Sequence, residues 1–387
     1  MDGSRGTAPW LAPDLLPEAE PGGGWGWWTG GRTWPMDLDL LRDELRQDPL
    51  RTKPPQVVLV TAPGAARALP AAEVPELREA VLGKFETILG GKVRRSAPLA
   101  ALFGGLAVLG LLLGAPPGLL LLVAILFLDP ASRLSEAWLD LRRLRRRPEA
   151  FLQQLGREIR FGWWLQGQAR RKPWTTWILA GSWAAIYLLQ VATGLDASVG
   201  AAGLVKAKVA AEPWRLLTGT MLHGSWLHIA MNAFAAVLLG TLIERVAHRH
   251  LLAPVWLLGA LGGSLASWWL LPNGDSVGAS GGLMAWLGFL VVLAWRRREL
   301  LPPDFFQGMA RAVLAMALLG LFAWGIVDNA GHGGGLLVGA LAAALIFRAP
   351  SGDLPLEAGW GLRISGLLGA AAFLALAVFT AAKVLSP

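Results

Sequence analysis

The stretch HGSWLHIAMN, residues 223–232, places two histidines and an asparagine inside an apolar run, 216–244, that has the length of a membrane-spanning helix. Polar side chains inside a membrane are energetically costly and usually mark a functional site. His228 and Asn232 are four residues apart, so they share one face of a helix. His223 falls about 140° round the same helix from His228. The stretch therefore predicts a spanning helix that turns His228 and Asn232 toward one point and His223 away from it.

The composition of the whole chain is that of a polytopic membrane protein. Hydrophobic residues make up 54% of the 387 positions, and several stretches of about 20 residues, the length of a span, carry almost no charge. The net charge of +8 lies in short runs beside those stretches, which fits the positive-inside pattern better than a nucleic-acid surface. We therefore predict an all-α polytopic membrane protein that lies in a lipid bilayer and binds no nucleic acid.

Seven apolar segments follow Pro173 and are predicted to be spans. They cover residues 174–194, 216–244, 251–271, 280–295, 311–327, 332–347 and 362–382. Loops with positive charge alternate along the chain with PNGDSV, residues 272–277, and VDNAG, residues 327–331, which have none. This alternation predicts a cytoplasmic N-terminal region, with the loops PNGDSV and VDNAG on the extracytoplasmic side.

The part before residue 174 divides by composition into three regions. Residues 1–95 are predicted to be a cytoplasmic, partly ordered region, with PGGGWGWWTGGRTWP, residues 21–35, as a loop and QVVLVTA, residues 56–62, as a possible strand. Residues 96–130 are apolar, are broken at Pro116-Pro117-Gly118 and have basic flanks. These flanks favour a helical hairpin, full or re-entrant, in which the part after the break is short for a span; one tilted, kinked helix is the alternative.

Residues 131–173 are strongly basic with interleaved leucine and tryptophan. Two interpretations stay open for this segment: an amphipathic helix lying on an anionic leaflet, or a solvated helix that only sets the topology. Both place it in the cytoplasm. The rest of the chain is predicted to form a six-span core over 174–348, with an additional span and the C-terminus over 349–387.

Two further polar sites are predicted at the same side of the membrane as His228. Ser280, in VGASGGLMAW, residues 277–286, stands where a polar loop meets an apolar helix. A helix N-terminus offers free backbone N–H groups and a positive dipole end, both of which suit a developing oxyanion. His332 opens the apolar helix GHGGGLLVGA, residues 331–340, and Gly335 and Gly339 lie on its own face. Glycines let helices approach closely, so we expect Ser280 and His332 to meet.

A serine beside a histidine base is the minimum for nucleophilic catalysis, and His228 and Asn232 have the chemistry of oxyanion donors. Other chemistries fit less well. GASGG matches the nucleophile elbow of soluble hydrolases, but here PNGDSV precedes it and membrane spans surround it, instead of a soluble α/β sheet. There is no cysteine and no H-E-x-x-H, and we expect neither a metal nor a cofactor. Asp328, four residues before His332, is expected either to cap the helix or to face water, and it is not counted among the catalytic residues.

These residues together resemble the rhomboid family of intramembrane serine proteases. The family pattern combines H-x-x-x-x-H-x-x-x-N, G-x-S-G and H-x-x-G-x-x-x-G in the second, fourth and sixth core spans, with Trp-Arg in the first outer loop and an acidic residue late in the second span. The matching residues are His223, His228 and Asn232; Gly278, Ser280 and Gly281; His332, Gly335 and Gly339; Trp214 and Arg215; and Glu244. The resemblance covers residues 174 to 348, and Gly331 departs from the alanine that many relatives have before the histidine.

The resemblance implies a Ser280–His332 dyad without a catalytic aspartate, with the oxyanion stabilised by His228, Asn232 and the backbone N–H of Ser280. It implies a six-helix rhomboid core plus one C-terminal transmembrane helix. It also implies cleavage of single-pass transmembrane proteins near the outer face of the membrane. The alternative is a catalytically inactive rhomboid-like protein that binds transmembrane helices, although such relatives usually lack the serine or the histidine. A transporter fits less well, because charged pairs near mid-membrane are missing from the sequence.

Overall fold

Helices dominate the computed structural model, which describes residues 7–19, 23–29, 32–46, 59–168, 171–323, 325–348 and 352–386. The helices are α1 Leu38–Arg46, α2 Arg78–Leu112, α3 Pro117–Arg146, α4 Pro148–Gln168, α5 Trp174–Thr193, α6 Leu195–Ala202, α7 Arg215–Thr218, α8 Trp226–Ile243, α9 Leu252–Leu270, α10 Ser280–Arg296, α11 Pro303–Phe322, α12 Asn329–Ile346 and α13 Trp360–Leu385. The strands are short: β1 Gly26–Thr29, β2 Arg32–Pro35, β3 Leu59–Thr61, β4 Leu69–Pro70, β5 Leu204–Val205 and β6 Asp275–Ser276. The predicted all-α fold class is confirmed.

Seven helical segments of the described chain are long and apolar enough to cross a membrane, and α10 is a shorter apolar helix. One of the seven segments, Trp226–Leu270, contains both α8 and α9. Between these two helices lie the π-helical turn η8, Glu244–His248, and the 3₁₀ turn η9, Arg249–Leu251, and the backbone is extended at His248. The protein is therefore an integral, multi-pass membrane protein.

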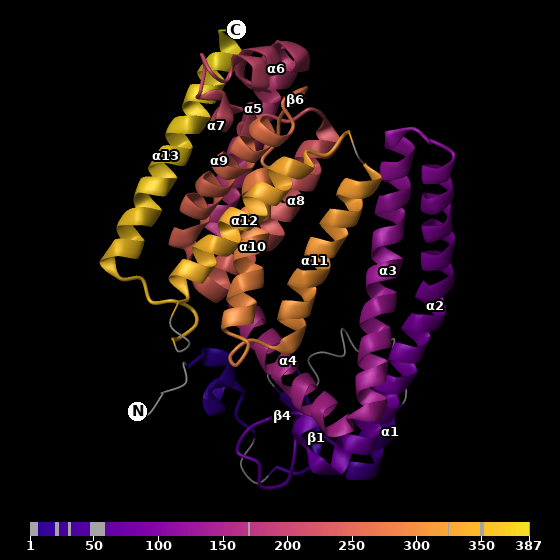
Figure 1. Cartoon of the computed structure of the whole chain (residues 1–387). Coiled ribbons are helices and arrows are strands. Elements are labelled where there is room, and N and C mark those ends of the chain that lie inside the picture. Colours follow the sequence, from indigo (N-terminus) through magenta and orange to yellow (C-terminus); the bar gives the residue numbers. More distant parts are fainter. Residues whose placement is uncertain are drawn as a thin grey trace.

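The short helix α10 lies at the centre of the bundle, between α8, α9, α11 and α12 (Figure 1). Most of its side chains are buried against other helices rather than exposed to lipid. Trp286, which is fully buried, donates its Nε1–H to the carbonyl oxygen of Leu252 at 3.0 Å. Because protein surrounds α10 on all sides, its length need not match the thickness of the hydrocarbon layer.

The apolar segment before the core forms a helical hairpin, α2 and α3, that stands beside α11 (Figure 1). Helix α3 continues through the basic run to Arg146, for 30 residues. The expectation that the part after the break is short is therefore wrong, and so is the alternative of one kinked helix. Near one end the hairpin and α11 share an apolar cluster that includes Leu120 and Phe322. Near the middle of α11, Arg311 Nε lies 3.1 Å from Glu136 Oε1, and near its other end Asp304 Oδ1 lies 4.0 Å from Arg143 Nη1. Helix α3 thus follows α11 along most of its length.

The N-terminal region has its own small core, built on α1, α4 and an antiparallel sheet in the order β2-β1-β3-β4. In residues 21–35, which were expected to form a loop, the described part is a β-hairpin in which Trp27 pairs with Trp34. Cross-strand aromatic pairs stabilise such a hairpin in spite of its glycines. Leu59–Thr61 form β3 as expected, whereas residues 56–58 lie outside the described chain.

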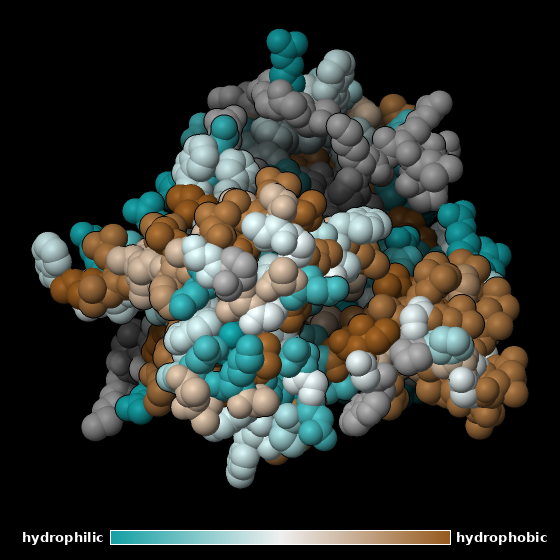
Figure 2. Space-filling view, turned by 90° about the horizontal axis from the view of Figure 1, so that it is seen from above, coloured by the Kyte–Doolittle hydropathy of each residue, from teal (hydrophilic) through white to brown (hydrophobic). Residues whose placement is uncertain are grey.

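Figure 2 looks along the bundle from the end where α6 and β6 lie. Pale and hydrophilic side chains gather over the middle of this end, and hydrophobic side chains flank them at the left and, most clearly, over the α2–α3 hairpin at the right. Such a polar end surface above apolar flanks is the arrangement that a bilayer imposes on a bundle of spanning helices. The loops that lead into α10 and α12 lie at this end (Figure 1).

Candidate active site

Ser280 is the first residue of α10, so its backbone N–H lies in the helix turn whose N–H groups have no partner within the helix. The chain enters α10 through Gly278, whose φ is +132°. Residues with a side chain rarely adopt this conformation. A glycine is therefore required two residues before the serine, and its missing side chain makes room for the imidazole of His228.

His332 lies in the first turn of α12, and the contact with Ser280 is direct. The Nε2 of His332 and the Oγ of Ser280 are 2.8 Å apart. Asp328 is the N-cap of α12 and accepts a hydrogen bond from the backbone N–H of Gly331 at 2.8 Å. Its other carboxylate oxygen accepts hydrogen bonds from the hydroxyls of Ser276, at 2.7 Å, and Ser267. Asp328 is thus the helix cap that its position predicts, and it holds the turn from which His332 projects.

The glycines of α10 and α12 explain why these two side chains meet. A Cβ atom added to Gly335 would overlap the carbonyl oxygen of Gly281, and one added to Gly339 would overlap that of Ala285. On the other helix, a Cβ atom at Gly288 would overlap the carbonyl oxygen of Leu336. The two backbones are therefore in direct contact, which small residues alone permit.

The polar pair of the second span lies against the loop before Ser280. A Cβ atom added to Gly278 would lie 2.7 Å from Nε2 of His228 and 3.6 Å from Nδ2 of Asn232. Both side chains thus pack against Gly278. Asn232 is buried, and its Nδ2 has no hydrogen-bond partner among the described residues. A buried donor without an acceptor is unfavourable in a folded protein. The amide of Asn232 is therefore available to donate a hydrogen bond to a bound group.

The placement expected for His223 is wrong. Helix α8 begins at Trp226, with Ser225 as its N-cap, so His223 is not on the helix and the 140° rotation does not apply. Its imidazole is fully buried and meets that of His228 edge to face, with ring centroids 5.2 Å apart. The backbone of His223 is held by Gln190, whose Oε1 accepts from its N–H at 2.9 Å. His223 therefore supports the ring of His228 from behind.

Trp214 and Arg215 hold the loop between α5 and α8. The buried guanidinium of Arg215 donates to the carbonyl oxygens of Gly203, at 2.8 Å, and Gly200, at 3.0 Å, and pairs with Glu212. Trp214 lies between Arg215 and a side chain of the last span, with its ring centroid 4.8 Å from Nζ of Lys383. In the same loop β5 pairs with β6, which lies just before Ser280. This loop is therefore fastened both to α13 and to the segment that carries the serine.

Glu244 lies at the far end of α8 from the site. Its Oε1 accepts hydrogen bonds from the backbone N–H and the hydroxyl of Thr176, both at 2.7 Å. Thr176 is in the first turn of α5, where backbone N–H groups lack partners within the helix. Glu244 therefore caps α5 and fixes α8 beside it, and it has no direct contact with the serine or the histidine.

Sequence reasoning missed Gln190, because a single glutamine in an apolar helix gives no spacing pattern. The side chain is fully buried and donates from Nε2 to Ser198 Oγ at 3.0 Å and to the carbonyl oxygen of His223 at 3.3 Å. The rarity of uncharged polar residues in the first span was the available signal. Ser267 and Ser276, which bind Asp328, carried no comparable signal.

The arrangement has the elements of acyl transfer: a hydroxyl in contact with an imidazole, an adjacent helix N-terminus, and two further side-chain donors. No group of three or more His, Cys, Asp or Glu side chains that could hold a metal ion occurs in the described part of the chain.

Fold and site together define a multi-span helical membrane protein in which a serine and a histidine from neighbouring helices are in contact. The rhomboid domain profile matches residues 210–349, which include every site residue predicted from the sequence but not Gln190. Residues 210–349 of the chain therefore form a rhomboid domain.

Three relatives illustrate the similarity. The chain is 34% identical over 170 residues to rhomboid protease GluP of Bacillus subtilis. It is 30% identical over 157 residues to the mitochondrial RHOMBOID-like protein 6 and over 155 residues to the chloroplastic Rhomboid-like protein 11, both of Arabidopsis thaliana. These alignments cover 43%, 38% and 36% of this chain and 31%, 47% and 55% of the relatives. The similarity is thus one of the core, and residues before the core lie outside the matched domain.

Proposed function

We propose that the protein is an intramembrane serine endopeptidase that cleaves transmembrane segments of single-pass membrane proteins. The observation that carries the proposal is the 2.8 Å contact between Ser280 Oγ and His332 Nε2 at the ends of two helices packed through glycine. The rhomboid domain over residues 210–349 and the similarity of this part to a relative named as a rhomboid protease support it.

In the proposed mechanism His332 takes the proton of the Ser280 hydroxyl as the oxygen attacks the scissile carbonyl carbon. The tetrahedral intermediate then collapses, the C–N bond breaks, and His332 gives its proton to the leaving amine. Water attacks the resulting ester in the same way and releases the acid and the free serine. Asp328 accepts from a backbone N–H and two hydroxyls, so its role is to hold α12 rather than to receive a proton.

The oxyanion would be stabilised by the backbone N–H of Ser280 and by the side chains of His228 and Asn232. The two side chains pack against Gly278, two residues before the serine, and Ser280 itself lies at the positive end of α10. Asn232 Nδ2, which lacks an acceptor among the described residues, gains one when the oxyanion forms. Each such donor contributes roughly 10²–10³ in rate in a serine protease.

We further propose that the site faces the extracytoplasmic side. The opposite ends of α8 and α10 carry Arg245, Arg249 and the run Arg296–Arg298, and basic clusters mark the cytoplasmic side. A substrate segment that reaches Ser280 must first unwind, because the carbonyls of an intact helix are engaged in hydrogen bonds. Segments with small or helix-breaking residues near that face are the expected substrates.

The test uses the purified full chain in lipid nanodiscs with a single-pass reporter and with a fluorophosphonate probe. We expect wild type to cleave the reporter and to be labelled, and Ser280→Ala and His332→Ala to lose cleavage by at least about 10³-fold. Reporter cleavage by Ser280→Ala at the wild-type rate would refute the mechanism. Wild-type protein that binds the reporter but is neither labelled nor active would instead support the inactive, helix-binding alternative.

A further inference from the structure

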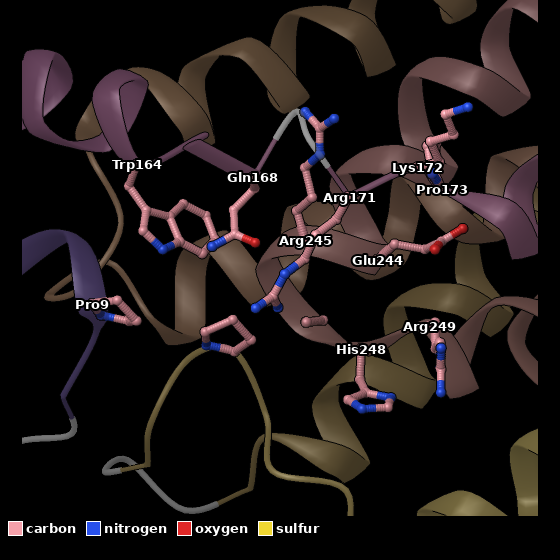
Figure 3. Close-up of a pocket in the computed structure, with 12 residues that line it drawn as sticks. Pro9, Trp164, Gln168, Arg171, Lys172, Pro173, Glu244, Arg245, His248 and Arg249 are labelled. Atoms are coloured by element: carbon pink, nitrogen blue, oxygen red, sulfur yellow. The ribbon is translucent and has the colours of Figure 1, made fainter. Parts of the chain in front are cut away.

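A cavity of about 550 Å³ lies at the end of the bundle opposite the serine, where α4, the connection to α5 and the η8–η9 turn meet (Figure 3). Pro9 and Trp164 of the N-terminal region form one side of it, and residues 244–249 of the rhomboid core form the other. The cavity therefore exists only because the N-terminal region packs on the core. Nothing in the proposed proteolytic mechanism uses it.

The lining is strongly basic. Arg171, Lys172, Arg245 and Arg249 contribute four cations, against the single carboxylate of Glu244. That carboxylate already accepts two hydrogen bonds from Thr176. Like charges gathered round a cavity repel one another, and an anion bound between them would reduce this repulsion. The charge of the lining therefore favours the binding of an anion.

Arg245 gives an independent indication. Its Nε is buried and has no hydrogen-bond partner among the described residues. A guanidinium N–H that is removed from water without an acceptor destabilises the fold. An anion with several acceptor oxygens would satisfy it, and arginine side chains suit the geometry of phosphate.

The position of the cavity is that of the membrane surface. Glu244 and His228 are 16 residues apart on one nearly continuous helix, so the cavity lies about 24 Å along α8 from the active site. Lys172 lies over the ring of Trp174, with its Nζ 5.6 Å from the ring centroid, and Trp174 is the first residue of span α5 and is 60% exposed. Exposed tryptophan at the start of a span marks the level of the lipid headgroups.

We propose that this cavity is a binding site for a phosphate group, supplied by an anionic phospholipid headgroup or by soluble phosphate. The bound group contacts both the connection that follows α4 and the turn that follows α8. It thereby joins the N-terminal region to the rhomboid core. The site is separate from Ser280, and binding can be measured without any proteolysis.

The test is native mass spectrometry of the full chain in detergent, titrated with phosphatidylglycerol, with zwitterionic phosphatidylcholine and with inorganic phosphate. The binding variant is Arg245→Gln/Arg249→Gln. The matched control is Arg94→Gln/Arg95→Gln, which removes two exposed cations outside the cavity. A cation near a membrane surface contributes about fivefold to the affinity for an anionic group, so we expect about thirtyfold weaker binding in the first variant and little change in the control.

Saturable binding of one phosphatidylglycerol per chain, weakened only in the cavity variant, assigns the site to a lipid headgroup. The same pattern with inorganic phosphate, without preference for the lipid, assigns it to a soluble phosphate. Equal weakening in both variants, or no saturable binding of either probe, overturns the proposal. If Arg245→Gln/Arg249→Gln does not fold, Arg171→Gln/Lys172→Gln, at two exposed positions of the lining, is the binding variant and is judged by the same outcomes.

Discussion

The contact between α10 and α12 makes Gly335→Ala the most informative perturbation of the site. The added Cβ atom would lie 2.8 Å from the carbonyl carbon of Gly281 and closer still to its oxygen. Ordinary contact requires at least about 3.4 Å between such atoms, so the two helices must separate by about 1 Å. The distance of 2.8 Å between Ser280 and His332 would then exceed the range of a hydrogen bond.

The expected effects of Gly335→Ala are large on activity and moderate on stability. A misplacement of about 1 Å in a catalytic pair lowers the rate about 100-fold. Overpacking of a well-packed interface destabilises by about 1–3 kcal/mol. The assays are reporter cleavage and thermal unfolding of the full chain in nanodiscs, with labelling by a fluorophosphonate as a measure of the reactivity of Ser280.

Gly333→Ala is the matched control, because it makes the same change on the same helix. A Cβ atom at Gly333 would meet nothing within 4 Å, and alanine is the better helix former by about 1 kcal/mol. We expect this variant to keep its activity and its stability. Wild-type cleavage by Gly335→Ala, or an equal loss in both variants, would refute the argument from helix contact.

Three further changes test other parts of the site and the fold. Asn232→Ala is expected to lower kcat about 10²–10³-fold with little change in KM, because its amide is proposed to bind the oxyanion and not the ground state. Asp328→Ala removes the cap bond to Gly331, and thermal unfolding should report a loss of about 0.5–2 kcal/mol. Burial and the nearby carboxylate of Asp304 raise the pKa of Glu158 above its ordinary value of 4.5. The folded state therefore binds more protons than the unfolded state above pH 4.5, and stability falls as the pH rises. Glu158→Gln should flatten this dependence in unfolding measured between about pH 5 and pH 8.

Each of these expectations has a result that contradicts it. An Asn232→Ala variant whose KM rises while kcat is unchanged would place the amide in substrate binding. Unchanged unfolding of Asp328→Ala would mean that its hydrogen bonds add nothing to the stability of α12. The same pH dependence of unfolding in wild type and in Glu158→Gln would contradict the raised pKa of Glu158. Asp328→Asn, which keeps one acceptor oxygen, should lie between wild type and Asp328→Ala.

The sequence predicted those parts of the fold that depend on spacing within one helix. Gly335 and Gly339 share a helical face with His332, and this periodicity indicated a close contact that would bring the imidazole to Ser280. The same reasoning failed for His223, because the helical wheel assumes a helix and the chain between residues 222 and 225 is not helical. Periodicity gives the face of a residue only where the backbone is regular.

Contacts between distant segments could not be predicted in this way. The pairing of β5 with β6 joins residues about seventy positions apart, and two-residue strands leave no alternation of polar and apolar residues to read. The bond between Gln190 and the backbone of His223 likewise depends on how α5 packs beside α8. Such features follow from the tertiary arrangement, which one sequence does not specify residue by residue.

The α2–α3 hairpin restricts the side from which another membrane helix can approach the bundle. Leu319 and Phe322 near the end of α11 are buried in a cluster with Ala107, Leu120 and Ala124 of the hairpin, and the middle of α11 is held by the Arg311–Glu136 ion pair. A helix diffusing in the plane of the membrane cannot dock on that flank of α11 without first displacing α3. The α2–α3 hairpin therefore makes the two sides of the bundle different. On the side of α11, the protein's own chain blocks the lateral approach of another membrane helix.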